Sequence, residues 1–203
     1  STRHSTLFPY TTLFRSVIGA NGTIGKLIIP VSRQKHEVIT AGRNGGDVVV
    51  DISSSSSIEN MFRQVYGIDA CICIAGESAT DAVSIITEEQ IHIGVRSKLI
   101  GQMNLVRIGQ HCLNDHGSFT LISGKLGDEP VKHSVGKAFV NGAINSFVKA
   151  ASLDMQRSIR INAVSPAPIV HVNAAELYTG YLTSVESTVN GQAMNALPAN
   201  ATR

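Results

Sequence analysis

Val17-Ile18-Gly19-Ala20-Asn21-Gly22-Thr23-Ile24-Gly25 is the stretch of this 203-residue chain that decides its fold. An apolar run enters it, three glycines follow at a spacing of three, and a segment that can form a helix leaves it. A strand, a glycine turn and a helix in this order form a dinucleotide-binding fingerprint, here as G-x-x-G-x-x-G. One glycine permits the sharp turn, one lets backbone approach a pyrophosphate, and one lets the helix pack closely on the sheet.

The same stretch predicts where a pyrophosphate binds. The first N–H groups of a helix have no partner within the helix, and the helix dipole makes this end positive. We therefore expect cofactor contacts from six residues, which are Gly19, Asn21, Gly22, Thr23, Ile24 and Gly25.

The composition favours one domain around a well-covered sheet. Hydrophobic residues make up 43% of the chain, enough for one sizeable core, and charged residues only 16%. The formal net charge is +2, which equals the charge of Arg3 and Arg15 in the first 16 residues, so the rest of the chain has no net charge. This balance favours neither nucleic acid nor an anionic membrane as a partner.

The three cysteines, Cys71, Cys73 and Cys112, indicate a reducing compartment. Their number is odd, and the first two lie two positions apart in an apolar run, a pattern typical of buried, reduced thiols. They have no metal-ligand spacing, so we expect no metal site, and no apolar run approaches the length of a membrane span. The expected location is cytoplasmic.

The first 16 residues differ in character from the rest. The string from Ser5 to Ser16 resembles translated sequencing-adaptor read-through, and it lacks the charged head, apolar middle and small-residue cleavage site of a signal peptide. We expect residues 1–16 to be a non-native segment that has replaced the first residues of strand one; a flexible native tail is the alternative. The domain is then expected over residues 17–196, with a tail over 197–203.

After the glycine turn, strand-like and helix-like segments alternate. The expected helices are 23–33, 58–65 (capped by the serines 53–57), 87–111 with a break near Gly94, 133–155 and 173–185. The expected strands are 37–41, 47–52, 69–76, 118–124, 159–164 and a stub near 192–194. Segment 47–52 has β-branched residues and no alternation, so we expect it to be buried on both faces. The alternation predicts an α/β class, single-domain Rossmann fold, with a doubly wound parallel sheet and right-handed crossovers.

In this order and spacing, four groups of residues resemble the short-chain dehydrogenase/reductase family from Val17 to about Gln192. They are the glycine turn, Asp51-Ile52, Ala75-Gly76, and Lys137-Ala138 followed by Arg160–Pro166. The resemblance implies that Asp51 and Ile52 meet the adenine ring and that Ala75-Gly76 is the small turn after strand four. It also implies that Pro166 lies in the turn beside the nicotinamide, with the backbone of Ile169 at the carboxamide.

The choice of cofactor depends on charge. An NAD site places a carboxylate about 20 residues beyond the glycines to bind the ribose 2′-hydroxyl. Here the second strand ends in Thr40-Ala41-Gly42-Arg43, without an acid. A guanidinium suits phosphate oxygens, so Arg43 favours NADP(H) over NAD(H). The alternative is a solvated loop arginine.

The family's Tyr-x-x-x-Lys pair is incomplete. His133 stands where the tyrosine is expected in His133-Ser134-Val135-Gly136-Lys137. Lys137 is then the expected cofactor anchor on the nicotinamide ribose. His133 would share a helix face with Lys137, and its pKa suits proton transfer near neutrality; alternatively it is a solvated residue of the first turn.

Two further residues are candidates for contacting the substrate oxygen. Ser123 lies near the family's substrate-orienting serine, although the register leaves Gly124 as an alternative. The family's asparagine in the middle helix aligns with Lys98, which would act as a proton relay or oxyanion group or would simply be a charged helix residue.

The resulting function is an NADP(H)-dependent oxidoreductase that transfers a hydride between the nicotinamide and a small-molecule carbonyl or alcohol substrate. The catalytic candidates are Lys137, His133, Ser123 and Lys98. The alternative is a catalytically inactive NADP(H)-binding sensor or scaffold protein, which the missing tyrosine motivates. The resemblance also implies a homodimer or higher homo-oligomer that pairs through the middle and long helices.

Overall fold

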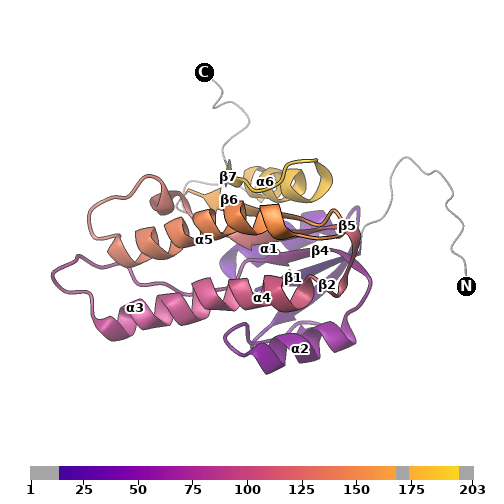
Figure 1. Ribbon diagram of the computed structural model, residues 1–203, viewed down its shortest axis with the longest axis horizontal. Helices are drawn as coiled ribbons and strands as arrows, with labels where there is room; N and C mark the ends of the chain where they lie inside the picture. Colours follow the sequence, from indigo (N-terminus) through magenta and orange to yellow (C-terminus); the bar gives the residue numbers. More distant parts are fainter. Residues whose placement is uncertain (1–13, 168–173, 197–203) are drawn as a thin grey trace, which may run out of the picture.

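The computed structural model describes residues 14–167 and 174–196 and contains one seven-stranded, wholly parallel sheet (Figure 1). The strand order is β3-β2-β1-β4-β5-β6-β7, so the predicted doubly wound fold is confirmed. The strands are β1 (Phe14–Ile18), β2 (Glu37–Gly42), β3 (Val48–Val49), β4 (Ile68–Cys73), β5 (Leu113–Ile122), β6 (Arg160–Pro166) and β7 (Ala193–Ala196).

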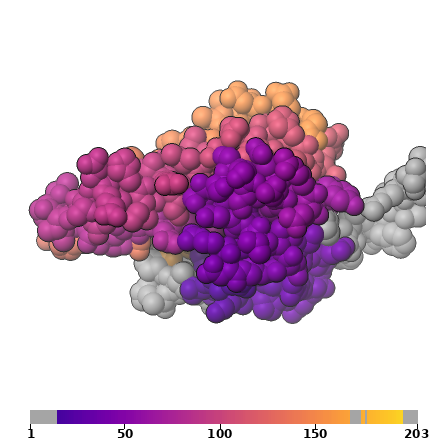
Figure 2. Space-filling model, turned by 90° about the horizontal axis from the view of Figure 1, so that it is seen from below, coloured from indigo at the N-terminus to yellow at the C-terminus, as the bar shows by residue number. Residues whose placement is uncertain are grey.

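Helices cover both faces of the sheet. They are α1 (Thr23–Ser32), α2 (Ser55–Gln64), α3 (Glu88–Gly94), α4 (Gly101–Gly109), α5 (Val135–Asp154) and α6 (Ala174–Glu186). One buried cluster joins the sheet to α2, α4 and α5, and a second joins it to α1 and α6. The loop before α3 and the start of that helix extend beyond the rest of the molecule (Figures 1 and 2). No helix in the described ranges has both the length and the apolarity that crossing a membrane requires.

Several local predictions are confirmed. Ser54 caps α2 by accepting a hydrogen bond from the Ser57 N–H, which satisfies one of the free donors at the helix start. Cys71 and Cys73 are fully buried in β4. The change expected near Gly94 is a switch into a π-helical segment, η1 (Val95–Ile100), which leads into α4.

The prediction for segment 47–52 is wrong in one respect. Only Val48 and Val49 pair with β2, and β3 is the edge strand of the sheet. Val48 and Val50 are buried, whereas the side chain of Val49 is 63% exposed. An edge strand covered on one face alternates in burial, which a run of identical valines does not reveal.

Strand β1 begins earlier than expected. It starts at Phe14, so Arg15 and Ser16, which belong to the segment expected to be non-native, lie in the sheet. The Arg15 guanidinium is buried and pairs with Glu186 at 2.7 Å. The Ser16 hydroxyl is fully buried with no hydrogen-bond partner among the described residues. Polar groups buried in this way cost stability.

Ser16→Ala is therefore expected to raise the free energy of unfolding by about 1 kcal/mol, because it removes an unsatisfied buried group. Thr120→Val is the matched control in a strand, because the Thr120 hydroxyl is hydrogen-bonded to the buried Ser184 hydroxyl at 2.6 Å. The control is expected to lower the free energy of unfolding by about 1–3 kcal/mol. Urea unfolding measures both changes, and a loss of stability in Ser16→Ala would contradict this account of β1.

Candidate cofactor and catalytic site

The strand order reverses between β1 and β4, and the turns that follow these two strands touch. Gly19 has a φ of +90°, and a Cβ there would lie 3.0 Å from the backbone nitrogen of Ala75. The predicted positions in the two turns are thus neighbours in space. Ligands of open α/β sheets bind in the crevice at such a switch point, outside the carboxyl ends of the strands.

The glycine turn leaves the start of α1 open. Gly22 is the N-cap of this helix, and no side chain caps it. Gly25 is buried and packs so closely that a Cβ would collide with the Ala20 carbonyl. Asn21 and Thr23 are exposed, and Asn21 faces Gly45 in the loop after β2. Exposed backbone at an uncapped helix start fits a pyrophosphate.

Arg43 lies at the same end of the sheet. Its side chain is 57% exposed, and its guanidinium lies 3.5 Å from the carboxylate of Glu77, which follows β4. An exposed ion pair at this distance is weak, so an incoming phosphate can displace Glu77.

Asp51 is an ionised acceptor near Arg43. Its Oδ1 accepts hydrogen bonds from the backbone and the hydroxyl of Ser53, at 2.9 and 2.7 Å. These bonds, together with Arg43 and Arg96, hold the pKa of the Asp51 carboxyl below its usual value. Oδ2 has no such bond to a described residue, so Asp51 remains able to accept one from a ligand.

The structure does not expose the Ile52 side chain. This side chain is 4% exposed, and a Cβ on Gly101 of α4 would lie 3.0 Å from its Cγ1. Any contact of Ile52 with an adenine ring must therefore involve its backbone. Ile169 lies outside the described residues.

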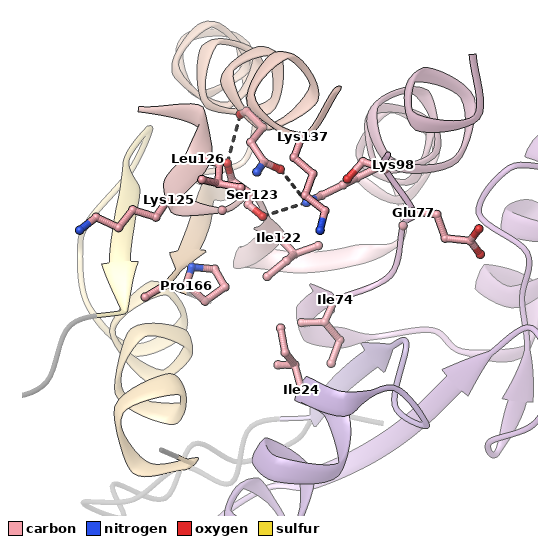
Figure 3. Close-up of a pocket in the computed structure, with 15 residues that line it drawn as sticks. Ile24, Ile74, Glu77, Lys98, Ile122, Ser123, Lys125, Leu126, Lys137 and Pro166 are labelled. Carbon is pink, nitrogen blue, oxygen red and sulfur yellow. Dashed lines mark hydrogen bonds between the residues drawn. The ribbon is translucent and has the colours of Figure 1, made fainter. Parts of the chain in front are cut away.

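A cavity of about 770 Å³ opens beside the two turns (Figure 3). It brings together six of the predicted residues, which are Ile24, Gly76, Lys98, Ser123, Lys137 and Pro166. Ile24, Ile74 and Pro166 give it apolar walls, and the amines of Lys98 and Lys137 lie close together across from Ile24 and Ile74 (Figure 3).

Lys98 is the most unusual group in this cavity. It lies in η1, where π-helical geometry interrupts the helix, a feature frequent at functional sites. The residue is 7% exposed, and its Nζ donates to the Ser123 carbonyl at 2.8 Å and to Asn141 Oδ1 at 2.7 Å. Burial, and then the nearby Lys137 ammonium, lower the pKa of Lys98 to about 8. The amine can thus gain and lose a proton near neutral pH.

Ser123 is close to Lys98 but is already engaged. Its hydroxyl donates to the Asn141 carbonyl at 3.1 Å, and the residue is 3% exposed. At Gly124, the other register, a Cβ would lie 2.7 Å from Asn141 Nδ2. Ser123 therefore contacts Lys98 through its carbonyl, and its hydroxyl is bonded to α5.

The prediction that His133 shares a helix face with Lys137 is wrong. Helix α5 begins at Val135, and His133 lies in the preceding turn with a φ of +61°. Its side chain is exposed and does not line the cavity. The helix starts too late for the expected i, i+4 relation, so Lys137 stands in the cavity without His133.

Two residues of the site were missed in the sequence. Asn141 accepts from Lys98 with its side chain and from Ser123 with its backbone, and Glu77 is the ion-pair partner of Arg43. Asn141 did carry a signal, because it is a polar residue four positions after Lys137, next to the buried Val140. Glu77 follows the predicted Ala75-Gly76 turn but carried no signal of its own.

Known proteins resemble the chain over most of its length. A family model described as enoyl-(acyl carrier protein) reductase matches residues 30–195. The solved structure of a protein from Listeria innocua is 36% identical, with a TM-score of 0.87 over 92% of this chain and 100% of its own. A small-chain dehydrogenase is 25% identical, with a TM-score of 0.81 over 91% of this chain and 96% of its own. Another, solved in complex with NADPH, is 23% identical with the same TM-score and the same coverage. A search of curated proteins found no match.

Asn141 is expected to control the pKa of Lys98. Asn141→Asp places a carboxylate beside the ammonium and raises this pKa, whereas Asn141→Leu removes an acceptor and lowers it further below about 8. The chemical shift of the ¹³C-labelled lysine ε-carbon, followed against pH, measures the change. Asn145→Leu, one turn further along α5 and bonded to Asp128, is the control that leaves this pKa unchanged. Equal pKa values in both Asn141 variants would contradict the role given to this residue.

Proposed function

The chain belongs to the short-chain dehydrogenase/reductase family, whose members are oxidoreductases, and we propose on this basis that it transfers a hydride between NADP(H) and a carbonyl or alcohol substrate. The observation that carries the proposal is the cavity beside the glycine turn, which contains a buried lysine amine able to exchange a proton near neutral pH. Such a group in a cleft is a candidate acid–base catalyst.

The residues at the glycine turn fit a dinucleotide. Gly19 and Gly25 have no room for a side chain, and the start of α1 is uncapped and exposed. Arg43 supports NADP(H) because its only ion-pair partner among the described residues is the exposed Glu77, which a 2′-phosphate can replace. A small-chain dehydrogenase of the same fold was solved with NADPH, which agrees with this choice.

When bound, the cofactor supplies or accepts the hydride. The chain's own part is to hold the reactants and to move the proton. In the proposed arrangement the Lys137 ammonium holds the nicotinamide ribose, and the apolar side chains of Ile24 and Ile74 limit the access of water. Lys98 Nζ donates a proton to the carbonyl oxygen during reduction and takes one from the alcohol during oxidation.

The hydrogen bonds of Lys98 suit both protonation states. An ammonium has three N–H donors, and two of them are used by the Ser123 carbonyl and by Asn141 Oδ1. The third is available to a substrate oxygen in the cavity. After this third proton has been transferred, the neutral amine still has two N–H groups for the same two acceptors. The amine therefore stays in position through the proton transfer, as catalysis by preorganised groups requires.

An inactive NADP(H) sensor is the second candidate. It is favoured by the absence of a tyrosine from the described residues that line the cavity. Tyr178 and Tyr181 are buried in the cluster with α1, on the opposite face of the sheet from α5, and Tyr66 is exposed. The two candidates differ in a single assay, since a sensor binds NADPH without oxidising it in the presence of any carbonyl compound.

Arg43→Ala is expected to weaken NADPH binding about tenfold and to leave NADH binding unchanged, because only NADPH carries the 2′-phosphate. Glu77→Gln removes the competing carboxylate and is expected to strengthen NADPH binding by up to about fivefold, the value of an exposed ion pair. Fluorescence titration with both cofactors measures these effects. Arg63→Ala, which removes an exposed arginine on α2, is the control. Equal losses for NADPH and NADH in Arg43→Ala would argue against NADP(H) specificity.

Lys98→Met is expected to lower kcat about 100- to 10,000-fold, the usual contribution of general acid–base catalysis, while NADPH still binds. In the wild type, carbonyl reduction needs the ammonium form, so its rate is expected to fall as pH rises through about 8. Alcohol oxidation needs the neutral amine and is expected to rise over the same range. Lys149→Met, an exposed lysine on α5, serves as the control. A Lys98→Met enzyme with normal kcat and an unchanged pH profile would remove Lys98 from the mechanism.

A further inference from the structure

Lys98 and Lys137, two of the three lysines that line the cavity, have no negative partner among the described residues. Lys98 donates only to neutral oxygens, the Ser123 carbonyl and Asn141 Oδ1. Lys137 is half-buried and forms no ion pair within the described part of the chain. Lys137 lies close enough to Lys98 for its positive charge to disfavour the charged form of Lys98. Buried charges are normally paired, so this excess of positive charge indicates that a ligand supplies the anion.

The other charged groups that line the cavity do not neutralise these lysines. Glu77 is the only carboxylate among the lining residues that the structure describes, and its side chain points away from Lys98 and Lys137 toward Arg43 (Figure 3). Lys125 adds a further positive charge to the lining, and its partner Glu129, at 2.9 Å, lies outside it.

The proposed cofactor does not neutralise them either. In the binding mode proposed above, its phosphates lie at the glycine turn and at Arg43. The nicotinamide ribose, which Lys137 would hold, is uncharged. The missing negative charge must therefore come from the substrate.

We propose that the substrate is a carbonyl compound with a carboxylate on the adjacent carbon, a 2-oxo acid or the corresponding 2-hydroxy acid. This inference rests on the proposed function and deepens it by naming the class of substrate. The carbonyl oxygen faces Lys98, which exchanges the proton, and the carboxylate pairs with a remaining N–H of Lys137. The apolar walls formed by Ile74 and Pro166 accept a short apolar remainder of the molecule. In the reduction, the hydride from the cofactor and the proton from Lys98 convert the carbonyl to the alcohol, and the carboxylate is unchanged.

The test compares oxamate with oxamide, an unreactive anion and a neutral molecule of nearly the same size and shape. Calorimetric titration of the protein saturated with NADP⁺ is expected to show that oxamate binds at least about tenfold more tightly than oxamide. Lys98→Met and Lys137→Met are each expected to lower the affinity for oxamate about tenfold, with the cofactor kept saturating. Lys149→Met removes a positive charge from α5 outside the cavity and is expected to leave the affinity unchanged. In turnover, pyruvate is expected to exceed methyl pyruvate in kcat/KM about tenfold or more.

The outcomes separate this inference from the proposed function. Equal binding of oxamate and oxamide, no binding of either, or preferred turnover of methyl pyruvate would overturn the inference even if NADPH is oxidised. Failure of NADP⁺ and NADPH to bind would overturn the proposed function instead. The oxamate titration is also repeated without cofactor, so that the anion site is tested even if no cofactor binds. Binding that Lys98→Met weakens about tenfold supports the anion site, and no binding contradicts it.

Discussion

The buried amine of Lys98 joins three of the elements that form the cavity. It extends from η1 and binds the carbonyl of Ser123 at the end of β5 and the side chain of Asn141 on α5. A charged amine buried this far from water is stable only where oxygen atoms accept hydrogen bonds from it. The helix with the π-helical segment, the loop after β5 and the start of α5 are therefore fixed relative to one another by the charge that they enclose.

In the proposed function Lys98 is the proton donor, because none of the described residues that line the cavity is a tyrosine. A proton donor must reach the substrate oxygen and must change its protonation state near the working pH. We propose that Lys98 meets both requirements, because it lines the cavity and because burial and the neighbouring Lys137 lower its pKa to about 8. In this proposal Asn141 and Ser123 act through Lys98 and are positioning residues.

The local features could be read from the sequence, and the long-range ones could not. The strand, glycine turn and helix at the start of the domain, the serine cap of α2 and the doubly wound parallel sheet depend on neighbouring residues or on general rules of α/β folds, so they were predicted correctly. The exposure of Val49 depends on which strand lies at the edge of the sheet. The contact of Lys98 with Asn141 joins residues 43 positions apart. His133 was misplaced because α5 begins two residues later than its pattern suggests, and a shift of this size decides which side chains reach the cavity.

The central claim is that the cavity lined by Lys98 and Lys137 holds the reactive end of NADP(H). A crystal structure of the protein with NADP⁺ and oxamate tests it most directly. The account predicts the pyrophosphate at Gly22 and the start of α1, the 2′-phosphate on Arg43, and the nicotinamide in the cavity with oxamate on Lys98. A cofactor bound elsewhere, or a nicotinamide site from which Lys98 is turned away, would contradict it.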